Sequence, residues 1–195
     1  KYAAAEIQCL RGDLGAALES VERSLSAGAL NAKALHLEAA LLRKLGRHVE
    51  AEAVASSALA QDPLDFRAAN ELYLARRGRG GTDGEAGGIL ARLEVSMRGE
   101  VQSYLELAVD YGNCGLWDEA IEVLKRAEGS TLRKTREYPL VHYYLGLYCG
   151  NGGRADEALR HFDTVVKGEA EETWPQLLAD HAAGRRARVY ENPGS

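Results

Sequence analysis

The sequence lacks several features that would assign it to a class directly. It has only three cysteines in 195 residues, Cys9, Cys114 and Cys149, an odd number spaced far apart. A small domain held together by disulfides needs paired cysteines, so these residues fit buried thiols in a reducing compartment, and we expect a cytoplasmic protein. No apolar run approaches the ~20 residues needed to cross a bilayer, which argues against a transmembrane helix.

An excess of positive charge is also missing. The chain has 24 Lys and Arg against 29 Asp and Glu, a formal net charge of −5, so we expect neither a general nucleic-acid binder nor a protein that adheres to membranes. It begins without an initiator methionine and without an export signal. Because it also starts partway through the repeat described next, we expect a piece of a longer protein.

The chain does contain one pattern that recurs about every 34 residues. Two pairs of small residues show this interval: Gly12 with Gly46, and Ala17 with Ala51. Later, GLWDEAIEVL at 115–124 recurs as GRADEALRHF at 153–162, a spacing of 38. The polar segment 129–139 accommodates the additional residues as a loop insertion. Periodicity of this kind indicates an array of repeated structural units.

A 34-residue unit with small residues at fixed positions resembles the tetratricopeptide repeat, a hairpin of two antiparallel helices. The resemblance implies an all-α fold: a right-handed α-solenoid of helix-turn-helix repeats, or α-α superhelix. Glycine at position 15 of the unit ends the first helix, and alanine at positions 8, 20 and 27 lets helices approach closely. A single hairpin cannot bury its apolar stripe, so each depends on its neighbours.

The resemblance covers about residues 1–168. Five units are expected, with these bounds: 1–31 (truncated), 32–65, 66–100 (degenerate), 101–134 and 139–172. The third unit is degenerate because GRGGTDGEAGG at 78–88 predicts a long loop. Thr82 and Glu85 form a candidate capping box, and the second helix of that unit is expected to begin near Glu85.

Beyond the repeats we expect one more helix, at 172–187. Its apolar residues Trp174, Leu177 and Leu178 would cover the last repeat, as terminal caps of solenoids do. Residues 188–195 are expected to form a disordered end.

No side-chain constellation predicts catalysis, so we expect no enzyme, no cofactor and no metal. The glycines of GRGGTDG lack the spacing of a phosphate-binding loop, and the histidines form neither an H-E-x-x-H motif nor a pairing with C-x-x-C. The acidic pairs Asp118–Glu119 and Asp156–Glu157 lie where the second helix of a unit begins, so they are better explained by the helix dipole than by acid–base chemistry.

The resemblance also implies where a partner binds. In the family, positions 2, 5, 6, 9, 12 and 13 of the first helix tend to line a concave groove. The residues of this sequence that match these positions are Lys33, His36, Arg43 and Lys44 in the second unit, Glu106 and Asn113 in the fourth, and Tyr143 and Tyr144 in the fifth. A lysine-and-asparagine clamp for terminal carboxylates is not reproduced, because Tyr2 and Glu6 occupy the equivalent positions.

Two functions remain open. The first is a non-catalytic scaffold that binds a protein or peptide in its concave groove. The second is a structural, docking or dimerisation region of a larger carbohydrate-active bacterial enzyme, because QSYLELAVDYGNCGLWDEAIEVL and YPLVHYYLGLY resemble the repeat region of large bacterial proteins with an N-terminal mutarotase-like β-sandwich. The expected partner is a protein, a peptide or another domain of the same chain rather than nucleic acid or membrane. Formation of homo-oligomers is a further possibility.

Overall fold

The computed structural model describes residues 2–27, 31–80, 83–129, 139–162, 165–167, 170–185, 187 and 189–191. The chain divides into two compact units, Lys1–Leu132 (unit 1) and Arg133–Ser195 (unit 2). Each unit is described by itself.

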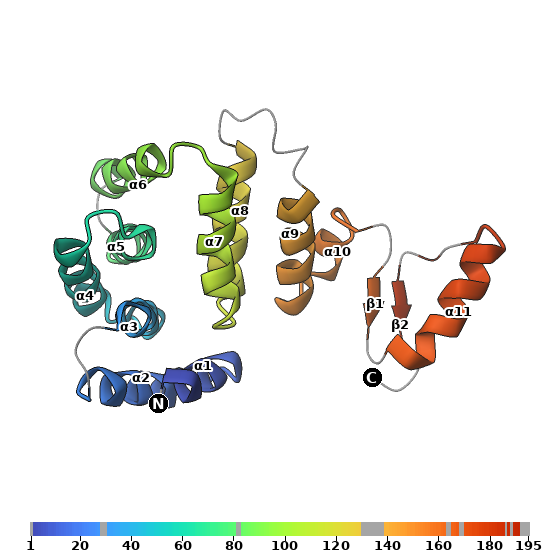
Figure 1. Ribbon diagram of the computed structural model, residues 1–195, viewed down its shortest axis with the longest axis horizontal. Coiled ribbons are helices and arrows are strands. Elements are labelled where there is room, and N and C mark those ends of the chain that lie inside the picture. Colours follow the sequence, from blue (N-terminus) through green and yellow to red (C-terminus); the bar gives the residue numbers. More distant parts are fainter. Residues whose placement is uncertain are drawn as a thin grey trace. The chain divides into compact units, whose positions relative to one another are not determined.

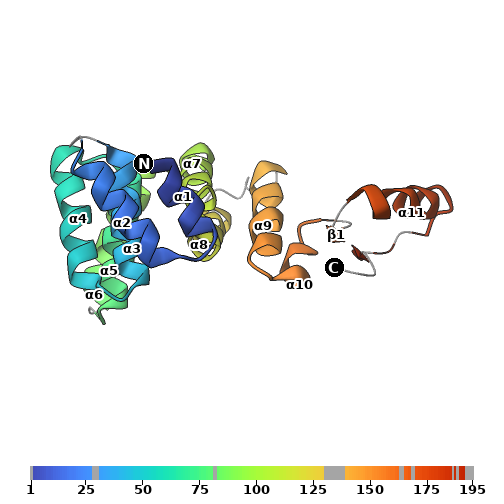
Figure 2. The same ribbon diagram turned by 90° about the horizontal axis from the view of Figure 1, so that it is seen from below.

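In unit 1 the described helices pair into consecutive hairpins (Figure 1). In chain order they are α1 (Tyr2–Leu10) with α2 (Leu14–Leu25), α3 (Ala32–Lys44) with α4 (His48–Gln61), α5 (Phe66–Gly78) with α6 (Asp83–Met97), and α7 (Val101–Gly112) with α8 (Trp117–Gly129). We call them the first to fourth hairpins. Figure 2 shows the same pairs from below. The predicted all-α fold of stacked helix-turn-helix repeats is thereby confirmed.

Local chemistry sets the ends of these helices. Asp13, Asn31 and Asp65 precede α2, α3 and α5, and each accepts a hydrogen bond from the backbone N–H three residues ahead, at 2.9–3.2 Å. These bonds satisfy N–H groups that have no partner inside the helix. Gly46 and Gly115 follow α3 and α7 with φ of 77° and 71°, the left-handed conformation that glycine adopts without a Cβ penalty.

Small residues lie where the helices cross. Ala17, Ala51 and Ala120, all at position 20 of their units, are fully buried. Tyr104 and Tyr111 of α7 are buried as well and fill the wider spaces around the fourth hairpin. Alternation of small and large side chains is how adjacent layers reach close packing.

The third hairpin differs from the sequence-based expectation. The loop is shorter than predicted, because α5 continues to Gly78 and α6 begins at Asp83, close to the expected start near Glu85. Ala86 and Ile89 pack against Tyr73 and Leu74 of α5 in one apolar cluster. This burial offsets the cost of a helical glycine, about 1 kcal/mol each. Thr82 lies outside the described residues, so the predicted capping box stays a prediction.

Unit 2 begins with a further hairpin, α9 (Pro139–Asn151) and α10 (Ala155–Ala158). A Cβ placed on Gly146 would lie 2.4 Å from the Phe162 ring, so the absence of a side chain at position 8 makes room for this ring. The short α10 is followed by β1 (Val165–Lys167) instead of a longer helix. β-branched residues in this segment favour an extended backbone.

The C-terminal segment corrects two expectations. The additional helix, α11, spans Ala170–Ala182 and leaves Trp174 and Leu178 52% and 49% exposed, so these side chains do not form the expected cover. The disorder predicted for 188–195 is wrong at β2 (Val189–Glu191), which pairs in parallel with β1. Tyr190 is 3% exposed, and its hydroxyl donates to Asp180 Oδ2 at 3.2 Å, which fixes this strand in place.

Candidate binding surface on the inner face

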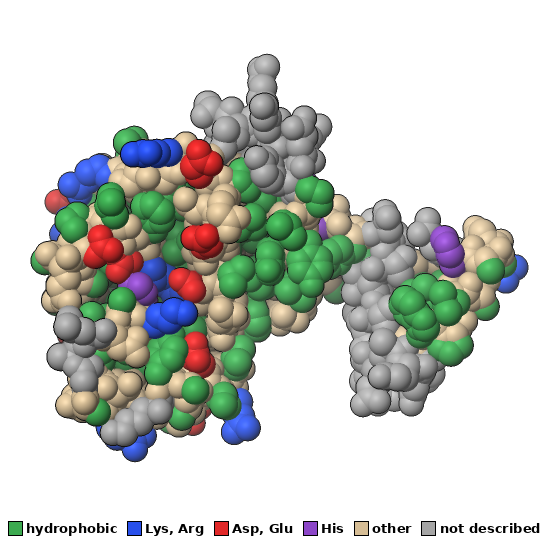
Figure 3. Space-filling view, viewed as in Figure 1, with side chains coloured by type: hydrophobic (Ala, Val, Ile, Leu, Met, Phe, Trp, Pro, Cys, Tyr) green, Lys and Arg blue, Asp and Glu red, His purple; other side chains and the backbone are tan. Residues whose placement is uncertain are grey.

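Alternate helices of unit 1 line opposite sides of the stack. In Figure 1, α3, α5 and α7 lie on the inner side, whereas α4 and α6 lie on the outer side. We call the surface formed by α3, α5 and α7 the inner face. Figure 3 shows basic, acidic and histidine side chains side by side on it.

Several of the predicted groove residues in unit 1 remain accessible. Lys33 on α3 and Glu106 on α7 are exposed, and Glu106 Oε1 accepts a hydrogen bond from Gln102 at 2.9 Å. Asn113 is exposed at the end of α7. His36 is half-buried, with Nε2 2.5 Å from Asp65 Oδ2. That carboxylate also caps α5, so His36 ties the second hairpin to the third.

Arg43 and Lys44 are instead engaged by carboxylates of their own chain. Arg43 Nε donates to Glu71 Oε2 at 2.8 Å, and Arg43 Nη1 lies 3.0 Å from Glu119 Oε1. Lys44 Nζ lies 2.8 Å from the same oxygen of Glu119. The Arg43 side chain is only 11% exposed. These contacts join α3 to α5 and to the start of α8.

The contacts continue inward from Glu71, which is fully buried. Its Oε1 accepts a hydrogen bond from the Tyr111 hydroxyl at 2.7 Å, and that hydroxyl accepts one from Asn70 Nδ2 at 2.7 Å. Asn70 Oδ1 in turn accepts from Arg126 Nη2 at 2.6 Å. We call the connected set the inner network; its members are Arg43, Lys44, Asn70, Glu71, Tyr111, Glu119 and Arg126.

Burial and charge shift the titration of this network in definite directions. Burial tends to raise the pKa of Glu119, but the adjacent Arg43 and the hydrogen bond from Lys44 outweigh it and hold the pKa below its ordinary value. Burial, followed by the Glu71 carboxylate, raises the pKa of Tyr111 well above its ordinary value. Tyr111 therefore remains a hydroxyl donor throughout the physiological range.

The first and fourth hairpins also meet directly. A Cβ on Gly115 would lie 3.2 Å from the backbone Cα of Leu10, so the turn between α7 and α8 lies against the end of α1. Cys9 and Cys114, next to these residues in sequence, are 5% and 2% exposed. Burial, chiefly, raises the pKa of the Cys9 thiol to about 12. This thiol is a packing group rather than a nucleophile.

The predicted tyrosines belong to unit 2. Tyr143 is 50% exposed and lies edge-on to Tyr144, with ring centroids 5.3 Å apart. Tyr144 is half-buried and stacks on Tyr148 at 5.6 Å. Tyr143 also meets the Phe162 ring edge-on at 6.2 Å. The covered part of the Tyr143 ring thus packs against aromatic side chains of its own unit.

The sequence interpretation overlooked Asn70, Glu71 and Glu119. Asn70 and Glu71 stand at positions 5 and 6 of the third unit, and position 5 is the one from which His36 was predicted in the second. The repeat register therefore carried the signal, but the glycine-rich segment made that unit look degenerate. Glu119 was explained by the helix dipole alone, and its pairing with Arg43 depends on how the fourth hairpin is turned.

Within the described residues, no group of three or more His, Cys, Asp or Glu side chains is placed to hold a metal ion. None of the described helices combines the length and apolar character needed to span a bilayer.

No protein-family model matches the chain, and no curated protein matches its sequence. Solved structures do match. The thermophilic TPR protein TTC0263 of Thermus thermophilus is 23% identical and aligns over 91% of this chain and 96% of its own, with a TM-score of 0.46. The crystal structure of MamA is 20% identical over 81% of this chain and 90% of its own (TM-score 0.45). MamA 41-end from Desulfovibrio magneticus RS-1 is 20% identical over 83% and 89% (TM-score 0.47). Similarity at this level concerns the fold and carries no functional assignment.

Proposed function

We propose that this protein is a non-catalytic interaction scaffold that binds a protein or peptide through the inner face of unit 1. The observation that carries the proposal is that some polar side chains predicted for this face are paired inside the molecule while others are exposed to solvent. Arg43 is bonded to Glu71 and Glu119 inside the molecule, whereas Lys33, Glu106 and Asn113 present polar groups to the outside.

This arrangement suits recognition by polar contacts. Buried ion pairs hold the helices in register, and a preformed surface loses less conformational entropy on binding than a mobile one does. Charged groups at the edge of such a surface influence the association rate and the choice of partner more than they influence raw affinity. We therefore expect a partner that carries both acidic and basic groups, to complement Lys33 and Glu106.

The test is a charge exchange that preserves net charge. Lys33→Glu combined with Glu106→Lys alters the exposed charges and leaves the inner network intact. In quantitative affinity purification from the native source, a bound partner should be recovered at least tenfold less with this double variant than with the wild-type protein. Glu19→Lys, an exposed residue of α2 outside the inner face, is the control and should leave recovery unchanged.

Equal recovery with the double variant and the wild-type protein would reject the inner face as the binding surface. Circular dichroism of both variants should match the wild type, because neither substitution touches a buried residue. A loss of helical signal in the double variant would mean that reduced recovery reflects misfolding.

A further inference from the structure

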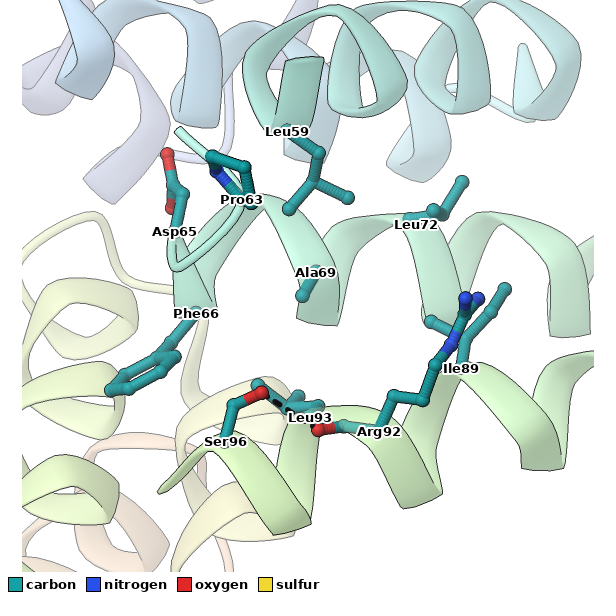
Figure 4. Close-up of a pocket in the computed structure, with 10 residues that line it drawn as sticks. All are labelled: Leu59, Pro63, Asp65, Phe66, Ala69, Leu72, Ile89, Arg92, Leu93 and Ser96. Atoms are coloured by element: carbon teal, nitrogen blue, oxygen red, sulfur yellow. Dashed lines mark hydrogen bonds between the residues drawn. The ribbon is translucent and has the colours of Figure 1, made fainter. Parts of the chain in front are cut away.

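A second surface lies on the outer side of unit 1, where α4, α5 and α6 leave a cavity of about 270 Å³. We call it the α4–α6 groove. Its lining is mainly apolar, and Figure 4 shows the side chains around the space. Its lining includes Leu59, Asp65, Ala69, Arg92, Leu93 and Ser96.

The groove exists because one side chain is small. Ala69 stands at position 4 of the third unit, the position that Tyr104 occupies in the fourth. Tyr104 is 2% exposed, and burial, followed by the Glu94 carboxylate of α6 in the preceding hairpin, raises the pKa of its hydroxyl. In the third hairpin the methyl group of Ala69 cannot reach α4 in this way, so Leu59 and Leu93 border an unfilled space.

The polar groups at the groove differ in whether they already have a hydrogen-bond or ion-pair partner within the chain. Asp65 is bonded to His36 and to the backbone of Ala68, and Ser96 donates to the Arg92 carbonyl at 2.9 Å. Within the described residues, the Arg92 guanidinium forms no ion pair, unlike Arg76 with Glu52 and Arg77 with Glu122. The unused charge at this apolar space is therefore positive.

Size and charge together specify the occupant. The cavity is smaller than the ~300–1,000 Å³ of sites that enclose a drug-sized ligand, so an anchoring side chain fits better than a whole small molecule. An apolar anchor in the groove would bring its neighbouring residue to Arg92. A carboxylate there would form an ion pair that the chain itself does not supply.

We propose that the α4–α6 groove binds an acidic segment of a partner protein, inserting one large apolar side chain beside Leu59, Ala69 and Leu93 while a neighbouring carboxylate pairs with Arg92. The proposal rests on the scaffold role but uses a surface separate from the inner face. It adds a second contact, of defined chemistry, to the contact proposed for the inner face.

The test measures fluorescence polarisation with three labelled nine-residue peptides. The first has Leu-Phe at its centre flanked by Glu, the second replaces Glu with Lys, and the third replaces Leu-Phe with Ser-Ser. The first should bind saturably, the second about fivefold more weakly because an exposed attraction becomes a repulsion, and the third not at all. No saturable binding of the first peptide up to about 1 mM overturns the proposal.

Two variants locate the binding. Ala69→Tyr installs the side chain that the fourth hairpin already accommodates, and it should weaken the first peptide at least tenfold while leaving the helical signal unchanged. Ala69→Ser keeps the space and should bind as the wild type does. Arg92→Glu should reverse the preference between the Glu and Lys peptides, whereas Arg11→Glu, an equal charge change on the first hairpin, should not.

Unchanged affinity in Ala69→Tyr would overturn the proposal. So would a wild-type dimer that Ala69→Tyr converts to a monomer in sedimentation, because the occupant would then be a second copy of the chain. The inner-face variant Lys33→Glu with Glu106→Lys should bind the peptides normally. Failure of the inner-face proposal and failure of this one are therefore distinguishable.

Discussion

Among single residues, Glu71 is the centre of the polar interior of unit 1. It is fully buried, and its two oxygens receive hydrogen bonds from Arg43 and from Tyr111. A buried carboxylate without partners is costly, so its donors stabilise the fold mainly by preventing that penalty. The residue therefore depends on side chains from both the second and the fourth hairpins.

Arg43→Met should be strongly destabilising for this reason. It removes the cation and leaves Glu71 buried without its charge partner, a change that typically costs about 3–5 kcal/mol. Urea denaturation followed by circular dichroism measures the loss. Tyr111→Phe removes the two hydrogen bonds of the hydroxyl, to Glu71 and from Asn70, and keeps the ring; it should cost less, about 1–3 kcal/mol. Equal effects of the two variants would contradict a dominant role for the charge.

Gly115 offers a second contrast at this scale. Gly115→Ala and Gly46→Ala both place a Cβ on a left-handed backbone, with φ of 71° and 77°, at about 1–2 kcal/mol each. Only the Cβ at 115 meets a neighbour, the Leu10 backbone at 3.2 Å; at 46 there is no atom within 4 Å. Thermal unfolding should show a lower midpoint for Gly115→Ala than for Gly46→Ala. A lower midpoint for Gly46→Ala would show that Leu10 moves away from the added Cβ without loss of stability.

At the scale of helices and strands, the elements that could be predicted from the sequence are those in which the helix-stop residues and the pattern of buried residues indicate the same structure. In α7 and α8, a glycine stop at Gly115 and buried alanines fall in the repeat register, and both helices form as expected. At 78–88 the glycines favour a long loop, but packing of Ala86 and Ile89 outweighs them, and α6 begins at Asp83. β2 was missed because its partner, β1, lies more than 20 residues away and pairing partners leave no local signature.

The candidate site was predictable only in part, for a related reason. The repeat register predicts Arg43 as a groove residue, and the structure pairs its side chain with Glu71 and Glu119. The register could not indicate that Glu119 reaches the same point, because this requires α7 and α8 to run crosswise to α3 and α5 (Figure 1). Helix orientation of this kind is set by side-chain volumes at the hairpin interface rather than by the periodicity of the sequence.

The start of α8 should make the stability of unit 1 depend on pH. The pKa of Glu119 lies below its ordinary value of 4.5 in the folded state, so the folded protein binds this proton less tightly than the unfolded chain does. The stabilisation is then fully present above about pH 5.5 and is lost as pH falls through 4.5 and below. Urea midpoints should accordingly fall in acid.

Glu119→Gln should reduce this fall without abolishing it. Asp65 contributes in the same direction: burial tends to raise the pKa of its carboxyl, but the hydrogen bond from His36 and those from the backbone N–H groups of Ala68 and Arg67 together lower it. Urea midpoints at pH 7 and at about pH 4, measured for both proteins, give the comparison. An identical acid dependence in the variant would show that the pairing of Glu119 with Arg43 does not contribute.

At the scale of the whole chain, unit 1 departs from a simple linear array. In a solenoid each repeat contacts its neighbours in sequence, and stability spreads from layer to layer. Here the first hairpin also touches the fourth at Gly115, and the second reaches it through Glu119. Hairpins far apart in sequence should therefore open together rather than one after another.

Hydrogen exchange tests this coupling. Leu18→Ala empties a buried position in α2 and should cost about 2–5 kcal/mol. We expect faster exchange in α1 and α2, and also in α7 and α8, with a smaller change in α6. Mass-spectrometric exchange of wild type and variant resolves these segments. An effect that decays steadily from the first hairpin to the fourth would indicate a linear array.

The contact between Leu10 and the Gly115 turn also bears on how this region would respond to tension. An open coil of hairpins lengthens gradually when its ends are pulled, because each layer gives a little. In unit 1 the contact between the first and fourth hairpins bears the force first, so the unit extends only after that contact breaks. Unit 1 would therefore resist extension until this contact breaks and would then extend abruptly.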